Sequence, residues 1–501
     1  MTDPQLFLDA HMLLAQLASG ETSSRDLLET QALRIANRNP AINAVVALNL
    51  DAARERAAQA DAARARGESW GPLHGLPITL KDTYEVPGMP CTAGAPALRN
   101  HRPQQPALAA RRLLDAGAIV FGKTNVPLFG ADIQTYNAVY GTTNNPWDTR
   151  RSSGGSSGGA AAALAAGFTP LEMGSDLAGS IRIPSHYCGV YGHKSTYGIV
   201  PLRGHIPGPP GTLSVPDLAV AGPMARSARD LRLMLDVIAG PAPQQQPAWQ
   251  LALPDARAGG LKDFRVLLWV DDPLCPIDDE MRTQYAELHH VLTAAGASVG
   301  SVGSVHAGAP LGLGLKDFVP LFLTGLGGVM SGGMAPAERA FLGWVAPLLH
   351  RVGRYVDFPT LFDHLLTGAG QRHADWCSTH EQAMRLTEQF RRIFDDYDII
   401  LMPPAATVAV PHVQRPHMVR RKITINGQRR YYTDLFMWIA PATLMGLPAT
   451  SAPLGVTAGG LPMNVQIVGD RFQDKTTIRF AELLAEVMGG YRPPPGYQDT
   501  P

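Results

Sequence analysis

The stretch that decides the fold is Ser152-Ser153-Gly154-Gly155-Ser156-Ser157-Gly158-Gly159, followed by an alanine-rich segment at 160–166 and then by GSDLAGSIRIP at 174–184. Two glycine-flanked serines therefore stand one short helix apart. A nucleophilic hydroxyl and the amides that stabilise its oxyanion must approach the same carbonyl, and a Cβ in that path would block the approach. A glycine- and serine-rich segment alone is also typical of a flexible linker. A linker would not lead into an uncharged helix and a second Gly-Ser turn, so the pattern favours a catalytic pair of loops.

The order of these motifs resembles the amidase signature family of serine hydrolases. The resemblance rests on GGSSGG, the alanine-rich helix, GSDxxGSIRxP and the CGxxG stretch at 188–192. Members of the family use a Ser/cis-Ser/Lys triad, which implies that Ser180 is the nucleophile and Ser156 the bridging serine. Upstream, LHGLPITLKD at 73–82 resembles the lysine motif of the family. It implies that Lys81 is the base of the triad.

The resemblance also implies roles for the residues around the two serines. The backbone amides expected to form the oxyanion hole are those of Leu177, Ala178, Gly179 and Ser180. The residues expected to support the loops are Gly155, Ser157, Asp176 and Arg182, of which the last two can brace the loop as a charge-assisted pair. The commoner family pattern has glycine where this chain has Ala178. Alanine would be unfavourable there if the position requires a positive φ.

A lysine base must be neutral to accept a proton. At pH 7 this requires lowering a reference pKa near 10.4 by about 3 units. Burial beside serines and backbone dipoles, without an unpaired carboxylate in contact, could lower the pKa of Lys81 that far. The neighbouring Asp82 must then point away or be neutralised.

One alternative assigns the nucleophile to a different serine. The sequence GGSSG at 154–158 satisfies Gly-x-Ser-x-Gly, the nucleophile elbow of α/β-hydrolases. Ser156 would then be the nucleophile of an esterase, with His412 or His417 as the base. Such an elbow needs a preceding strand, whereas residues 149–153 are polar and turn-like.

Composition excludes several classes of function. The 501 residues carry 43 basic and 43 acidic side chains, so nothing favours a nucleic acid partner. The four cysteines are scattered, which argues against a disulfide scaffold or a metal site and favours a reducing cytoplasm. No basic region precedes an apolar core at the N-terminus, so no secretory signal is predicted. The expected chemistry requires no cofactor and no metal.

The fold that the resemblance implies is α/β: a single α/β/α domain around a large twisted mixed β-sheet. Within it we expect an N-terminal helical segment at 1–70, the catalytic core at 71–240, a variable region that builds the substrate pocket and its cover at 241–435, and the C-terminal part of the core at 436–501. The uncharged stretch at 318–337 is long enough to span a bilayer. Its glycines and prolines make a poor helix, so we expect no stable membrane insertion.

The expected function is hydrolysis of the C–N bond of a small amide through a Ser180 acyl-enzyme. The segment at 305–362 is apolar and favours a hydrophobic or aryl amide, while carbamates and esters stay open; its aromatic residues, most of them expected in the core, are Phe318, Phe322, Phe341, Trp344, Tyr355, Phe358 and Phe362. A second hypothesis is one component of an amidotransferase, which delivers ammonia to a partner and tRNA. The sequence leaves the oligomeric state open, a homodimer included.

Overall fold

The computed structural model describes residues 4–206, 209–256, 259–301, 312–352, 358–359 and 361–497. The α-helices are α1 (Ala10–Ser19), α2 (Ser24–Ile42), α3 (Leu50–Ala65), α4 (Leu108–Asp115), α5 (Gly158–Ala165), α6 (Arg182–Cys188), α7 (Ala228–Ile238), α8 (Asp279–Ala294), α9 (Leu315–Met330), α10 (Pro336–Val352), α11 (Asp363–Gly370), α12 (His373–Arg391), α13 (Ile393–Asp396), α14 (Ala440–Leu444) and α15 (Asp474–Met488). The strands are β1 (Val45–Leu48), β2 (Pro77–Lys81), β3 (Ile119–Thr124), β4 (Tyr136–Asn137), β5 (Gly141–Thr142), β6 (Leu171–Asp176), β7 (Tyr191–Lys194), β8 (Val220–Ala225), β9 (Arg265–Leu268), β10 (Ser298–Ser301), β11 (Ile399–Met402), β12 (Lys422–Ile425), β13 (Gln428–Tyr431), β14 (Ala449–Val456) and β15 (Pro462–Val468).

An eight-stranded sheet in the order β10-β9-β11-β15-β14-β7-β8-β6 forms the centre of the molecule. Strand β9 runs parallel to both β10 and β11. The remaining neighbours, from β11 to β6, pair antiparallel. The sheet is therefore mixed, and the α/β fold class predicted from the sequence is confirmed.

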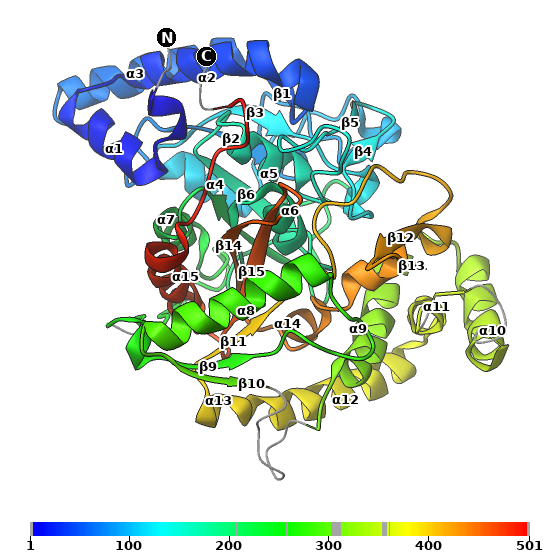
Figure 1. Ribbon diagram of the computed structural model, residues 1–501. Helices are drawn as coiled ribbons and strands as arrows, with labels where there is room; N and C mark the ends of the chain where they lie inside the picture. The colour runs from blue at the N-terminus through cyan, green and yellow to red at the C-terminus, as the bar shows by residue number, and fades with distance from the viewer. Residues whose placement is uncertain are drawn as a thin grey trace.

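Helices cover the central sheet on both sides (Figure 1). Helix α6 packs on β14 and β15 on one side, and α15 and α7 pack on β14 and β8 on the other. A second sheet of three strands, β1-β3-β2, lies beside the first. Its strand β2 packs against β6, the edge strand of the central sheet. This contact brings the strand that ends in Lys81 to the loops that carry the serines.

Small residues allow helix α5 to sit in the middle of the molecule. Every residue of α5 is buried, and none is charged. A Cβ at Gly158 would lie 2.3 Å from Oγ1 of Thr135, and one at Gly159 would lie 2.3 Å from the backbone nitrogen of Asn125. Only glycine fits at these two positions, so the GG pair that opens α5 is required by packing.

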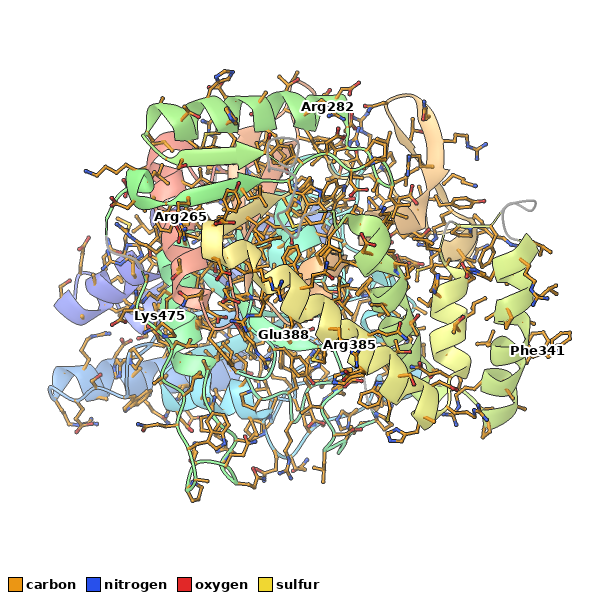
Figure 2. The ribbon with its side chains drawn as sticks, turned by 90° about the horizontal axis from the view of Figure 1, so that it is seen from below. Arg265, Arg282, Phe341, Arg385, Glu388 and Lys475 are labelled. Carbon is orange, nitrogen blue, oxygen red and sulfur yellow. The ribbon has the colours of Figure 1, made fainter. Side chains whose placement is uncertain are left out.

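The aromatic residues of the variable region divide between core and surface. Phe318 and Phe322 of α9 are fully buried, whereas Phe341 and Trp344 of α10 are 60% and 71% exposed. Figure 2 shows Phe341 pointing away from the rest of the molecule. Tyr355 lies outside the described residues. Within the described ranges, no helix combines the length and the apolar character that crossing a membrane requires.

Candidate active site

Lys81 ends strand β2 and is completely buried. Its Nζ lies 2.8 Å from Oγ of Ser156, 2.9 Å from Oγ of Ser157 and 2.9 Å from Oγ of Ser175. A neutral amine has two N–H donors and one lone pair, so three hydroxyls satisfy it without a counter-ion. Among the described residues, no carboxylate forms an ion pair with Lys81.

Burial is the main cause of the unusual acidity of this lysine. Desolvation lowers the pKa of Lys81 from 10.5 to about 7, against the opposing pull of Asp176 and Glu172. The neighbouring Asp82 points away, because its carboxylate accepts hydrogen bonds from the backbone nitrogen and Oγ1 of Thr92. Near neutral pH, Lys81 is therefore partly in the neutral form that a base requires.

Ser156 lies in the loop before α5, and the Gly155–Ser156 peptide bond is cis. A Cβ at Gly155 would lie 2.5 Å from the backbone oxygen of Asp132, so only glycine fits beside that chain segment. A Cβ at Gly130 would lie 3.3 Å from Oγ of Ser156. The loop that contains Gly130 therefore forms a wall beside the Ser156 hydroxyl, and its Leu128 and Phe129 are exposed.

Ser180 lies in the turn between β6 and α6 and is 8% exposed. Its carbonyl oxygen accepts a hydrogen bond of 3.1 Å from the backbone nitrogen of Ser157, so the two serine loops are joined through the main chain. Among the described residues, no hydrogen bond joins the hydroxyls of Ser156 and Ser180. Catalytic hydrogen bonds often shorten only when substrate binds.

An ion pair holds the Ser180 turn from inside. The carboxylate of Asp176 lies 2.9 Å from Nη2 of Arg182 and also accepts hydrogen bonds from the amides of Gly179 and Ile181. Both charged side chains are buried. Burial alone would raise the pKa of Asp176, but Arg182, with help from Lys194 and the Ile181 amide, lowers it to about 2. The structure thus brings Asp176 and Arg182 together in the bracing pair that the sequence predicts.

The amides around Ser180 are not equally available to an oxyanion. The amide of Gly179 is committed to Asp176, while those of Leu177, Ala178 and Ser180 have no recorded acceptor among the described residues. Three of the four amides expected from the sequence therefore remain candidates. Gly179 has a φ of 89°, whereas the φ of Ala178 is not positive. The alanine at 178 is therefore not strained.

Two features of the site were not predicted from the sequence: the contact between Ser175 and Lys81, and a buried ion pair between Asp132 and Arg421. Ser175 shows no local pattern that reveals its contact with Lys81; the one indication in the sequence is its place beside Asp176 in the GSD motif. Ser157, expected to support the loop, also contacts Lys81. A buried ion pair joins Asp132 to Arg421 at 2.6 Å, and Tyr136 and Tyr432 donate hydrogen bonds to the same carboxylate. Residues so far apart in the sequence give no local pattern that reveals such a pair.

Breaking this ion pair is expected to destabilise the wall beside Ser156. The Asp132→Asn variant leaves the buried Arg421 cation without its partner, which costs about 3 kcal/mol or more. We expect a clear fall in the midpoint of thermal unfolding. The matched control is Glu381→Gln on α12, whose pair with Arg385 is exposed and contributes about 0.5 kcal/mol or less. Equal midpoints for the two variants would contradict the assignment.

The nucleophile-elbow hypothesis is wrong. In the described part of the chain, the regular strand nearest upstream of Ser156 is β5, which ends at Thr142. The side chain of Ser156 contacts Lys81, and no histidine of the described residues forms a hydrogen bond with it. The polar 149–153 segment forms no strand, as its composition indicates, so Ser156 lacks both the elbow and the base.

Two groups of metal-ligating side chains occur outside this site in the described residues. One joins His350 of α10 to Asp363 and His364 of α11. The other contains Asp9, His11 and Asp230. In that group the Asp230 carboxylate already accepts the backbone amides at the start of α1, so it has a structural role.

Known proteins resemble this chain along nearly its whole length. A sequence model of the amidase family matches residues 26–311 and 349–478. The chain is 31% identical over 484 residues to a glutamyl-tRNA(Gln) amidotransferase subunit of Synechococcus sp. (strain CC9605), covering 93% of each protein. It is 31% identical over 495 residues to an acylamidase of Rhodococcus erythropolis, covering 96% of each. The crystal structure of a bacterial aryl acylamidase of the amidase signature family superposes with a TM-score of 0.77 at 24% identity, covering 99% of each chain. The chain belongs to the amidase signature family and is a hydrolase that acts on carbon–nitrogen bonds.

Proposed function

We propose that the protein hydrolyses a hydrophobic or aryl amide through an acyl-enzyme on Ser180. The observation that carries this proposal is the buried Lys81 amine, which contacts the hydroxyl of Ser156 at 2.8 Å and no carboxylate within the described residues. A desolvated amine with a pKa of about 7 is matched to proton transfer near neutral pH.

In the proposed mechanism, neutral Lys81 takes a proton from Ser156 while Ser156 takes the proton of Ser180. The Ser180 oxygen then attacks the amide carbon, and the free amides of the Ser180 turn receive the developing oxyanion. The amine leaves with the proton that returns through Ser156. Water then attacks the acyl-enzyme by the same proton route, which releases the carboxylic acid and restores Ser180. The reaction uses no cofactor.

The apolar surroundings of the site support a hydrophobic substrate. Leu128 and Phe129 are exposed on the loop beside Ser156, at 48% and 40%. On the Ser180 side, Leu177 is half-buried. These side chains offer an acyl or aryl group contact area without a charged partner. Carbamates and esters with the same groups would fit the same chemistry. A cytoplasmic location is part of this proposal.

The substrate class is tested by offering one aromatic acyl group as a primary amide and as an anilide. The rate of the Ser180→Ala variant is subtracted from each. We expect serine-dependent release of aniline to exceed release of ammonia. Faster release of ammonia would indicate a primary amidase and contradict the aryl assignment.

The likeness to the Synechococcus amidotransferase component favours one second candidate, a protein that releases ammonia for a partner. That relative is named for its action on glutamyl-tRNA(Gln). A protein of this kind should co-purify with its partners and hydrolyse glutamine faster than aryl amides. Purification of the tagged chain from its own cells, followed by both assays, separates the two candidates.

A further inference from the structure

A buried carboxyl group lies behind Lys81 and has no part in the proton relay. Glu172 is on strand β6 and has no exposed surface. Its Oε1 accepts a hydrogen bond of 2.6 Å from Oγ1 of Thr79, and its Oε2 accepts one of 3.1 Å from the backbone nitrogen of Met173. Among the described residues, no cation forms an ion pair with it. Burying a carboxyl without a partner is costly, so its presence requires an explanation.

Thr79 links this carboxyl to the lysine. Thr79 and Lys81 are alternate residues of β2, so their side chains lie on the same face of the strand. The hydroxyl that donates to Glu172 therefore lies on the same face of β2 as the lysine side chain. The ionised carboxylates of Asp176 and, less strongly, Glu172 raise the pKa of Lys81, which opposes the effect of burial.

The two groups titrate in the same range. Burial raises the pKa of Glu172 to about 7, and burial lowers the pKa of Lys81 to about 7. When two interacting groups titrate together, the charge of each depends on the other. A proton on Glu172 favours a neutral Lys81, and loss of that proton favours a charged one.

Other ionisable groups lie near the pair. On β6, Asp176 stays ionised and is paired with Arg182. Burial keeps the pKa of His205 at about 3 and raises the pKa of Tyr84 well above its usual value, so both are neutral. On β3, Lys123 favours the ionised form of Glu172 and donates a hydrogen bond to the backbone oxygen of Tyr84. Burial also lowers the pKa of Lys194 to about 7, but the charges that act on Lys194 are those of Arg182, Asp176 and Asp474. Burial raises the pKa of Asp82, whose carboxylate points away from Lys81 toward Thr92. Of the two described carboxyls whose charge acts on Lys81, Asp176 and Glu172, only Glu172 changes its charge in the same pH range as the lysine.

We propose that Glu172 is a positioning residue for Lys81: its buried carboxyl, held by Thr79, sets the basicity of the lysine amine. Burial alone would weaken the amine as a base further, because the charges of Asp176 and Glu172 oppose the lowering of its pKa. The carboxyl restores part of that basicity without touching the substrate or the serines. This inference rests on the proposed function, because it concerns the same base.

The test follows the rate of covalent labelling by a fluorophosphonate between about pH 5 and pH 9. In this reaction a serine oxygen bonds to phosphorus, fluoride leaves, and the serine proton passes to the base. The labelling rate therefore rises as Lys81 loses its proton. The Glu172→Gln variant keeps an oxygen that can accept from Thr79 but removes the charge. We expect the midpoint of the rise to move to lower pH by about half a unit or more.

The matched control is Glu388→Gln on α12, which removes the same charge from an exposed position. Its midpoint should equal that of the wild type. An unchanged midpoint in a folded Glu172→Gln variant would overturn the inference. If that variant fails to fold, Thr79→Val removes the hydroxyl that stabilises the carboxylate and should move the midpoint in the same direction. An unchanged midpoint there would overturn the inference equally.

The same experiment separates this inference from the proposed function. Absence of labelling at every pH, or labelling that persists in Ser180→Ala, would contradict Ser180 as the nucleophile. Labelling of Ser180 with a midpoint that Glu172→Gln does not move would contradict only the role of Glu172.

Discussion

Replacing Lys81 with methionine is expected to abolish turnover, with a loss of about 10⁴-fold or more. Methionine matches the length of the lysine stem but cannot accept a proton from Ser156. The loss should appear in the acylation step, because the base is needed when Ser180 attacks. Stopped-flow or burst measurements with an activated ester would show this loss as a slow first turnover. A variant within tenfold of the wild type would show that Lys81 is not the base.

The same substitution is expected to change how stability depends on pH. The pKa of Lys81 is about 7 in the folded protein and 10.5 when unperturbed. Between these values the unfolded chain binds more protons, so folding stability rises with pH across this window. Lowering the pKa by this amount corresponds to roughly 5 kcal/mol.

Lys81→Met removes this slope. The difference in unfolding free energy between variant and wild type should therefore shift in favour of the variant as pH falls from about 10 to about 7. Denaturant unfolding of both proteins at several pH values measures this difference in unfolding free energy. A difference that does not vary with pH would mean that Lys81 is charged in the folded protein. The matched comparison is Lys475→Met, since Lys475 pairs with an exposed Asp255 and lies outside the site.

Replacing Ser180 with alanine is expected to remove activity, again by about 10⁴-fold or more, while the protein stays folded. The hydroxyl of Ser180 has no recorded hydrogen bond among the described residues, so its loss leaves no buried partner unsatisfied. The unfolding midpoint should therefore stay close to that of the wild type. Activity on the preferred amide and circular dichroism of the same sample check the two halves of this prediction.

Ser185→Ala is the matched control for this variant. Ser185 lies in α6, five residues from Ser180, and its buried Oγ has no recorded partner. Both variants remove one hydroxyl from the same region of the chain. Ser185→Ala should keep wild-type activity. Loss of activity in both variants would indicate that packing, and not the nucleophile, explains the effect at Ser180.

The sequence was sufficient to predict the parts of the site that depend on local chain geometry. The glycines around Ser156 and Ser180 are required because backbone or side-chain atoms stand within 3 Å of any added Cβ at Gly155 and Gly179. Because these close contacts require glycine at fixed distances from each serine, the motif has a fixed spacing. The resemblance based on that motif therefore indicates which serines and which lysine come together. The mixed α/β sheet followed from that resemblance and not from the strand pattern of the chain.

Contacts between distant segments could not be predicted. Glu172 meets Thr79 across 93 positions of sequence, and Asp132 meets Arg421 across 289. Such pairs depend on how β2 packs against β6 and on how the segment before β12 returns to the loop beside Ser156. The amide of Gly179 was expected to face an oxyanion but donates to Asp176, because the carboxylate folds back under its own turn. The four-part division of the chain stays a prediction.

The most direct measurement is the site of covalent modification by a fluorophosphonate, found by mass spectrometry of the digested protein. We expect a single adduct on the peptide that contains Ser180, absent in Ser180→Ala and strongly reduced in Lys81→Met. An adduct on Ser156, or an adduct that forms equally well without Lys81, would contradict the mechanism.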